Sequence, residues 1–330
     1  MTKSIFISIL LLCMSLVLRS QDPQFSQFYA APTYLNPAFA GSAEQSRLTA
    51  NYRNQWPSIP GAFVTYRASY DRFIENISSG VGISAMHDRA GTGAMRATSV
   101  DLQYNFEFQI FKDIYLRPGM EFGFTNSSIN FNDLTFGDQL VRDGAESTVE
   151  PYTPPVVNYF DFGSGGLIYG RNFWAGASVY HLNEPNQSLL GGASRLPKKL
   201  SVHGGYRFNL KSMRNKKGSD LLAAFQYKKQ GDFQQLDLGL YVETSPMVFG
   251  LWYRSIPFKQ NVEGYFNHDA ISVLAGFHTG PYKIGYSYDF TVSQLGIGNT
   301  GGSHEISIIY EWANDKSQFQ RRRIVPCAKF

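Results

Sequence analysis

The 330-residue chain is poor in charge, nearly free of cysteine and, beyond its start, without a long apolar run. Charged residues make up 17% of the sequence, against about a quarter in soluble domains. No segment after residue 20 approaches the roughly 18 to 20 unbroken apolar residues of a membrane helix, which argues against a helical membrane protein. A formal net charge of only +4 argues against a nucleic-acid binder, which would show a dominant basic surface.

The first 20 residues have the layout of a secretory signal peptide. Lys3 gives a basic start, residues 5–17 form an apolar run, and the small residue Ser20 precedes a cut before Gln21. A lipid anchor on Cys13 is the alternative, although the apolar run continues beyond that residue. The sequence therefore predicts an exported protein with residues 1–20 removed.

Removal of this segment changes both the charge and the cysteine count. It takes away Lys3 and Arg19 and no acid, so the formal net charge falls from +4 to +2. Cys327 is then the single cysteine, which excludes an internal disulfide and a structural cysteine-type zinc site. Aromatic residues are abundant at 15%, as are the 31 glycines. An exported chain of this composition predicts a β-barrel in an outer membrane, where only every second residue faces lipid.

Apolar and polar residues alternate with a period of two along many segments. In residues 100–110 the even positions are apolar, whereas Asp101, Gln103 and Glu107 lie among the odd ones. The same pattern returns in residues 114–124, 236–243 and 282–290, and it places each set on one side of a sheet. The polar face of a soluble β-sandwich, the alternative fold, would carry many Lys, Glu and Thr. Here that face holds Gly, Gln, Asn, Ser and charges of both signs, as expected of a crowded lumen.

The alternation predicts about fourteen strands, most of them of the 9–11 residues with which a tilted strand spans a bilayer. They are residues 47–54, 62–71, 80–88, 98–110, 114–125, 158–169, 172–182, 199–210, 220–229, 233–244, 247–255, 270–279, 282–291 and 304–312. Most short links (111–113, 170–171, 245–246, 280–281) follow even strands, and the long ones (126–157, 183–198, 256–269, 292–303) follow odd strands. An even-stranded barrel with both termini in the periplasm and long outer loops has this asymmetry. We expect an all-β, antiparallel transmembrane barrel over residues 46–313, preceded by an aromatic segment (21–45) and followed by a basic tail (314–330).

Short motifs stand at both ends of the predicted barrel. Segments 22–28 and 35–41 contain Asp22, Pro23, Phe25, Ser26, Gln27 and Phe28, then Asn36, Pro37, Ala38 and Gly41. Segment 52–56 contains Arg53, Gln55 and Trp56 in a Y-R-x-Q-W pattern, and residues 286–289 and 302–306 stand in the last two predicted strands. Together these motifs resemble those of the PorP/SprF family of the type IX secretion system. The ending Cys327-Ala328 departs from the Cys-Pro that members often have.

The resemblance implies an outer-membrane barrel that works beside the type IX translocon of gliding and related bacteria. Such barrels are needed for export or surface attachment of particular large proteins, including gliding adhesins, and recognise them by a C-terminal domain. The implied partners are translocon components, that cargo domain and outer-membrane lipid. Neither nucleic acid nor a cofactor or metal is implied.

The segment 21–45 is aromatic and punctuated by proline, which favours turns over regular helix. We expect it to fold into the lumen or over its periplasmic mouth as a plug. Its aromatic residues would then pack against lumen aromatics such as Tyr115, Tyr241 and Trp174. The alternative is a flexible linker, although disordered linkers are normally poor in aromatics.

Candidate partner-binding residues are aromatic and arginine residues in segments expected to be exposed. They are Tyr152, Tyr159, Phe258 and Tyr265 outside, and Arg321, Arg322 and Arg323 inside. The six histidines lie on different predicted strands and ends, and no catalytic motif is recognisable, so an enzyme is not expected. A passive porin is the alternative function. Lumen charges of both signs, such as Arg117, Asp237, Asp289 and Glu305, favour internal salt bridges, and about fourteen strands enclose less space than a water-filled porin.

Overall fold

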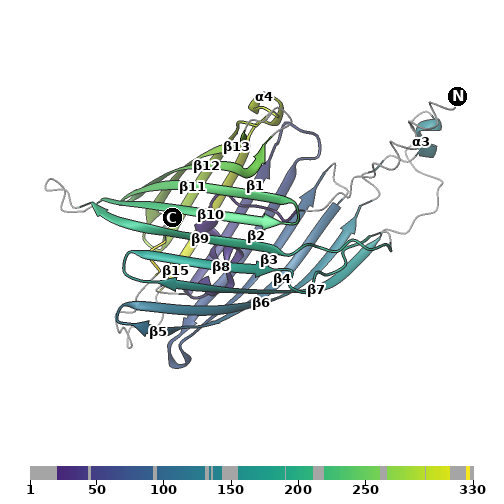
Figure 1. The fold of residues 1–330 in the computed structure, drawn as a ribbon. Coiled ribbons are helices and arrows are strands. Elements are labelled where there is room, and N and C mark those ends of the chain that lie inside the picture. Colours follow the sequence, from purple (N-terminus) through teal and green to yellow (C-terminus); the bar gives the residue numbers. More distant parts are fainter. Residues whose placement is uncertain are drawn as a thin grey trace.

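The alternating segments wind the chain into a closed antiparallel barrel in the computed structural model (Figure 1). The structure describes residues 21–43, 46–91, 95–130, 134, 137–142, 155–189, 191–210, 219–260, 266–293, 295–312 and 325–327. The side chains of residues 257–260 and 266–267 are outside this description. Among the described residues, no helix is both long and apolar enough to cross a membrane.

The strands follow one another around the barrel in chain order. They are β1 (Ser46–Gln55), β2 (Phe63–Ile74), β3 (Ser79–Ala90), β4 (Met95–Phe106), β5 (Phe108–Phe111), β6 (Ile114–Ile129), β7 (Val156–Tyr169), β8 (Phe173–Tyr180), β9 (Lys199–Leu210), β10 (Ser219–Gln230), β11 (Phe233–Thr244), β12 (Met247–Gln260), β13 (Phe266–Thr279), β14 (Tyr282–Thr291) and β15 (Ser303–Trp312). Short helical turns are η1 (Phe28–Ala30), α2 (Pro32–Leu35), η2 (Pro37–Phe39), η3 (Glu75–Ile77), α3 (Gly137–Val141) and α4 (Ile297–Thr300).

Closure depends on two pairings. β1 pairs with β15, and β4 pairs with β6, so fourteen strands complete the ring while the short β5 adds to the start of β6. Closure gives each strand of the ring a neighbour on both sides over most of its length, so most backbone N–H and C=O groups bond to neighbouring strands rather than facing lipid. The predicted all-β, fourteen-stranded antiparallel barrel is confirmed.

The predicted strands are all present, and three of them (199–210, 233–244 and 282–291) have the predicted bounds. The predicted strand 98–110 is interrupted at Glu107, giving β4 and β5. Pro118 lies on β6 between the residues that pair with these two strands, and proline has no N–H to donate. The predicted link 256–269 is wrong over most of its length, because β12 continues to Gln260 and β13 begins at Phe266.

The two ends of the barrel differ. We call the edge where β1 begins and β15 ends the terminal rim, and the opposite edge the loop rim. The long links 130–155, 181–198 and 292–302 all lie at the loop rim, as the alternation of an antiparallel ring requires. Figure 1 shows α3 and α4 at this end and β5 at the other.

The outer face of the wall is apolar, whereas the inner face carries both polar residues and an apolar cluster. On β11, Leu238 and Leu240 are 48% and 51% exposed on the outside, whereas Asp237 and Tyr241 point inward and are buried. The terminal-rim half of the lumen holds an apolar cluster. Its wall residues include Leu167, Tyr169, Trp174, Leu222, Tyr241, Val248, Trp252, Leu274 and Ile309. The lumen therefore holds apolar as well as polar side chains.

Candidate functional site

Residues 21–43 lie inside the barrel. Gln27, Ala30, Asn36 and Phe39 are completely buried. The segment begins in the loop-rim half, where Asp22 contacts Gln230 at the end of β10, and it ends at the terminal rim, where β1 starts. It runs through η1, α2 and η2, and its residues join the apolar cluster of the wall.

Proline and asparagine explain the short turns of this segment. Pro32 and Pro37 begin α2 and η2, where a helix tolerates a residue without N–H. The Oδ1 atom of Asn36 accepts a hydrogen bond from the N–H of Ala38 at 2.9 Å, which caps η2. The backbone therefore turns repeatedly without forming a helix longer than four residues.

Asn36 also joins the segment to the wall. Its Nδ2 atom donates to the carbonyl oxygens of Gly166 at 3.0 Å and Ala177 at 3.1 Å. A Cβ atom on Gly165 would lie 2.2 Å from Asn36 Oδ1, so glycine is required for this close approach.

The end of the second motif is held at the terminal rim. The N–H of Gly41, whose φ is +65°, donates to Asp71 Oδ2 at 2.7 Å, and Asp71 in turn binds Arg47 at 2.9 Å. Asn105 Nδ2 donates to the carbonyl oxygen of Ala40 at 2.8 Å. The turn at residues 37–41 is thus fixed from β1, β2 and β4 together.

A buried charge network holds the first motif. The Ser26 hydroxyl accepts hydrogen bonds from Arg53 Nη1 at 2.7 Å and Arg254 Nη2 at 2.9 Å, and it donates to Asp289 Oδ2 at 2.6 Å. Arg53 also contacts Asp289 at 2.9 Å and Glu305 at 3.1 Å. Arg254 bonds through Nε to Asp237 at 2.9 Å. Both guanidinium groups are only 3% exposed.

Glu305 receives the backbone of the motif directly. Its two carboxylate oxygens accept the N–H groups of Ser26 at 2.6 Å and Gln27 at 3.1 Å. The Gln27 amide donates to Ser287 Oγ and to the carbonyl oxygen of Glu305. The structure therefore brings the motif residues Ser26, Gln27 and Arg53 together with the two late motifs, which supply Asp289 and Glu305.

Aromatic rings of the segment pack against aromatic rings of the wall in the lumen. Tyr29 meets Trp174 and Tyr241 at centroid distances of 5.6 and 6.4 Å, and Phe28 meets Trp252 at 4.9 Å. The expected contacts of the segment with Tyr241 and Trp174 are present. Whether the segment acts as a plug stays a prediction.

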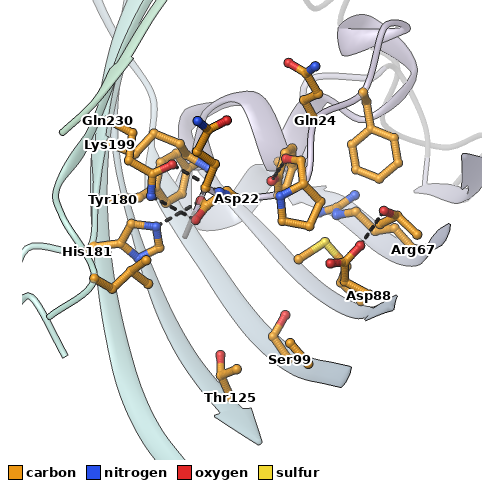
Figure 2. Close-up of a pocket in the computed structure, with 18 of the residues that line it drawn as sticks. Asp22, Gln24, Arg67, Asp88, Ser99, Thr125, Tyr180, His181, Lys199 and Gln230 are labelled. Atoms are coloured by element: carbon orange, nitrogen blue, oxygen red, sulfur yellow. Dashed lines mark hydrogen bonds and ion pairs between the residues drawn. The ribbon is translucent and has the colours of Figure 1, made fainter. Parts of the chain in front are cut away.

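On the loop-rim side of the segment, the lumen contains a cavity of about 490 Å³, which we call the vestibule (Figure 2). Asp22 stands at its floor and accepts hydrogen bonds from His181, Lys199 and Gln230 at 2.9, 2.5 and 3.0 Å. The opposite ring nitrogen of His181 is 2.7 Å from Asp161.

His181 is thereby held as a cation between two carboxylates. Burial alone would lower its pKa, but Asp22 and Asp161 outweigh this effect and raise the pKa to about 9. Burial would likewise raise the pKa of Asp22, yet His181 and Lys199 hold it well below its usual value. The start of the segment is therefore anchored by ion pairs.

The other candidate residues are placed as follows. Gln55 and Trp56 line the vestibule, as do Pro23 and Phe25. Tyr159 lies within β7 and also lines the vestibule rather than an outer loop. Phe258 belongs to β12, but its side chain lies outside the described residues, as do Tyr152, Tyr265 and the arginines Arg321, Arg322 and Arg323.

Part of the basic tail also lies against the lumen. Val325 is 1% exposed and belongs to the apolar cluster. Arg207 donates to the carbonyl oxygens of Pro326 at 3.3 Å and Cys327 at 2.9 Å, and it is held by Glu243 at 2.6 Å. Both ends of the chain therefore contribute to filling the terminal-rim half.

Sequence reasoning missed Arg254, Asp71 and Arg207. Arg254 and Asp71 belong to none of the motifs, and the alternation alone does not reveal their partners. Within the described ranges, no group of three or more His, Cys, Asp or Glu residues is placed to hold a metal ion. The arrangement binds a polypeptide segment of its own chain.

One protein family, described as "Type IX secretion system membrane protein PorP/SprF", matches residues 17–310. No curated protein sequence matches the chain. Similar solved structures include an outer membrane protein of Acinetobacter baumannii (TM-score 0.47, 6% identity, covering 82% of this chain and 100% of that one). The toluene transporter of Pseudomonas putida (0.47, 10%, 85% and 93%) and a FadL homologue of Pseudomonas aeruginosa (0.45, 13%, 86% and 94%) are others. At TM-scores below 0.5, these likenesses support no conclusion about this chain.

The buried network predicts the effect of removing its central cation. Arg53→Ala leaves Asp289 and Glu305 without one of their partners, so we expect the free energy of unfolding to fall by about 3–5 kcal/mol. Urea titration of the protein refolded in detergent micelles measures this. The control is Arg171→Ala, which removes an exposed ion pair with Asp113 and is expected to cost at most about 1 kcal/mol. Equal losses in both variants would contradict the role of the network.

The anchor at Asp22 predicts a pH dependence. Because folding raises the pKa of His181 from 6.5 to about 9, its stabilising effect is complete below pH 6.5 and is lost as the pH rises through 9. A spin label at Gln24→Cys, in a Cys327→Ser background, should become mobile with a midpoint near pH 9. In His181→Gln the label should be mobile already at pH 7. A label that is equally immobile at pH 7 and pH 10.5 would contradict the anchor.

Proposed function

Because the chain belongs to the PorP/SprF family of type IX secretion system membrane proteins, we propose that it serves the export or surface attachment of particular cargo proteins by recognising them. It is an outer-membrane barrel of that secretion system and belongs to no known enzyme family. The proposed cargo is a secreted protein such as a gliding adhesin, bound through its C-terminal domain. The other partners are translocon components and the lipid of the outer membrane.

The observation that carries this proposal is the occupied lumen. Within this segment, residues 25–33 and 35–43 are buried inside the barrel, and the network around Ser26 ties them to the wall. A barrel filled in this way is suited to binding at its rims rather than to passing solutes. The terminal rim would face the periplasm, with residues 1–20 removed as a signal peptide, and the loop rim would face outward.

The two rims have different proposed partners. At the loop rim, the links 130–155 and 181–198 and the candidates Tyr152, Tyr159, Phe258 and Tyr265 would meet the cargo domain. At the terminal rim, the basic turn 211–218 and Arg321 to Arg323 would meet periplasmic components. Aromatic and arginine side chains are enriched at the energetic centres of protein interfaces, which supports these choices.

Cargo display tests the proposal. Replacing residues 130–155 with a Gly/Ser linker of the same length leaves both flanking strands intact, so the barrel should still fold and insert. We expect the cargo to disappear from the cell surface, as it should in a strain that lacks the whole chain. Surface labelling of the cargo measures this, and heat-modifiable migration of the barrel controls for folding. Normal display in the linker strain would remove the loop from the proposal, and normal display in the deletion strain would end the proposal itself.

Conductance separates this function from a passive porin. In planar bilayers the intact protein should give no stable open channel, because residues 21–43 occupy the lumen. Deleting residues 21–40 should produce stepwise conductance, since the space held by the segment is then open to water. The matched control is a chain with residues 137–142 deleted, which shortens a loop-rim link and should stay closed. A conducting intact protein would favour the porin, and an unchanged trace after deletion of residues 21–40 would contradict the plug.

A further inference from the structure

The strand β7 is longer than its neighbour β8. β7 has 14 residues and β8 has 8, and the two pair only from Ser164 opposite Val179 to Tyr169 opposite Trp174. On its other side, β7 pairs with β6 as far as Val156. Residues 156–163 of β7 therefore have no strand partner on the β8 side within the described part of the chain. The barrel wall has an open strand edge there, at the loop rim.

The backbone groups that face this edge can be identified. Leu182 donates its N–H to the carbonyl oxygen of Phe162 at 3.0 Å, and Asn183 Nδ2 donates to that of Phe160 at 2.7 Å. Since the groups of successive strand residues face opposite sides, the even-numbered residues of β7 face the edge. The N–H of Phe162 is taken by Asp161 Oδ1 at 2.9 Å. Within the described residues, the N–H of Phe160 and both backbone groups of Asn158 and Val156 remain unpaired.

The link that follows β8 turns away from this edge. Its residues Gln187 and Leu196 line the vestibule, and Leu196 is only 5% exposed. The link therefore covers the vestibule side, and beyond Asn183 its described residues make no hydrogen bond to β7. Among the described residues, none therefore pairs with Val156 or Asn158 on this side.

The side chains beside the edge form two different surfaces. On the outside, Val156 and Phe160 are 53% and 66% exposed, so an added strand would lie next to apolar side chains. On the inside, Tyr159 and Asp161 line the vestibule. A strand with apolar residues on one face and polar residues on the other matches these two surfaces.

The part of the vestibule wall next to this edge carries several acidic side chains. Three further carboxylates line the vestibule on β3, β4 and β6: Asp88, Asp101 and Glu121. They accept hydrogen bonds from neutral groups, namely Thr65 Oγ1 at 2.6 Å, Ser99 Oγ at 3.2 Å and Gln103 Nε2 at 2.8 Å, respectively.

Three of the cations that line the vestibule contact residues of the N-terminal segment. Arg67 donates to Thr33 in the N-terminal segment, and His181 and Lys199 bind Asp22. Among the described residues, none of these three cations lies within 4 Å of Asp88, Asp101 or Glu121. A basic side chain entering from the loop rim would therefore meet acidic groups that form no ion pair within 4 Å with these three cations.

We propose that the open edge of β7 pairs with an extended segment of the exported protein in which apolar residues alternate with lysine or arginine. Unpaired strand edges bind an incoming strand through main-chain hydrogen bonds, and alternate side chains give specificity. The basic residues of the segment point toward Asp161 and the carboxylates of the vestibule, and the apolar residues continue the outer surface of Phe160. This inference rests on the proposed function, because it specifies which part of the cargo is recognised.

Peptide binding to the full chain in nanodiscs tests the pairing. The probe is a fluorescent nine-residue peptide of alternating valine and lysine, blocked at both ends, and its anisotropy is measured at low and physiological salt. We expect saturable binding, and at least a tenfold weaker affinity when the backbone N atoms of alternate residues are methylated. N-methylation removes hydrogen bonds and keeps the side chains, so equal binding of the methylated peptide would overturn strand addition. A valine–glutamate peptide should bind at least tenfold more weakly, and equal binding would overturn the acidic surface as the basis of selection.

Variants of the edge complete the test. Asn158→Pro removes an N–H that faces the open edge and leaves the pairing with β6 intact, so affinity should fall about tenfold. The comparator Asn158→Ala keeps this N–H and should lose less than twofold. Equal affinities in the two variants would overturn the inference.

Cargo display distinguishes failure of this inference from failure of the proposed function. If the whole-chain deletion abolishes display while Asn158→Pro displays cargo like Asn158→Ala, the function stands and the edge has no part in it. If the deletion leaves display normal, the proposed function itself is wrong. Loss of display in Asn158→Pro alone, with a folded barrel, supports the edge.

Discussion

The pairing of β1 with β15 is the constraint on which both the barrel and its interior depend. It joins the two ends of the sheet, and its register places Arg53 directly opposite Glu305, although the two residues are 252 positions apart. Asp289 stands nearby, on the strand next to β15. The step that joins the two ends of the sheet therefore also brings together a cation and two carboxylates inside the wall. Those buried charges need hydrogen-bond partners, and Ser26 and Gln27 of the N-terminal segment supply them.

The protein consequently has two apolar surfaces rather than one. Outside, residues such as Leu240 face lipid, which replaces the core of a soluble protein. Inside, Phe28, Tyr29 and Phe39 pack with wall residues such as Trp174 into a cluster of the kind found in soluble domains. The high aromatic content serves both surfaces. The inner cluster is built around the N-terminal segment, so wall and segment are expected to fold together.

Much of the fold could be predicted because a wall that has lipid on one side and a lumen on the other imposes a strict period of two. This period located β9, β11 and β14 to the residue. It could not show the break at Glu107 or the extension of β12 to Gln260, because those depend on local pairing partners. For the site, the motifs identified Ser26, Gln27 and Arg53. That these residues meet Asp289 and Glu305 follows from register and closure, which pairwise sequence spacing does not contain. Arg254 and Asp71 carry no motif and were missed for the same reason.

The interior is asymmetric along the barrel axis, and this asymmetry bears on where a partner can act. In the terminal-rim half, aromatic packing, the turn at residues 37–41 and the residues 325–327 occupy the space, so an incoming chain would have to displace many contacts at once. In the loop-rim half, the vestibule is open and its wall carries carboxylates whose described contacts are neutral. The same half contains the short β8 and the open edge of β7. Binding from the loop rim, as proposed, would therefore require no rearrangement of the network around Ser26 in the other half of the lumen.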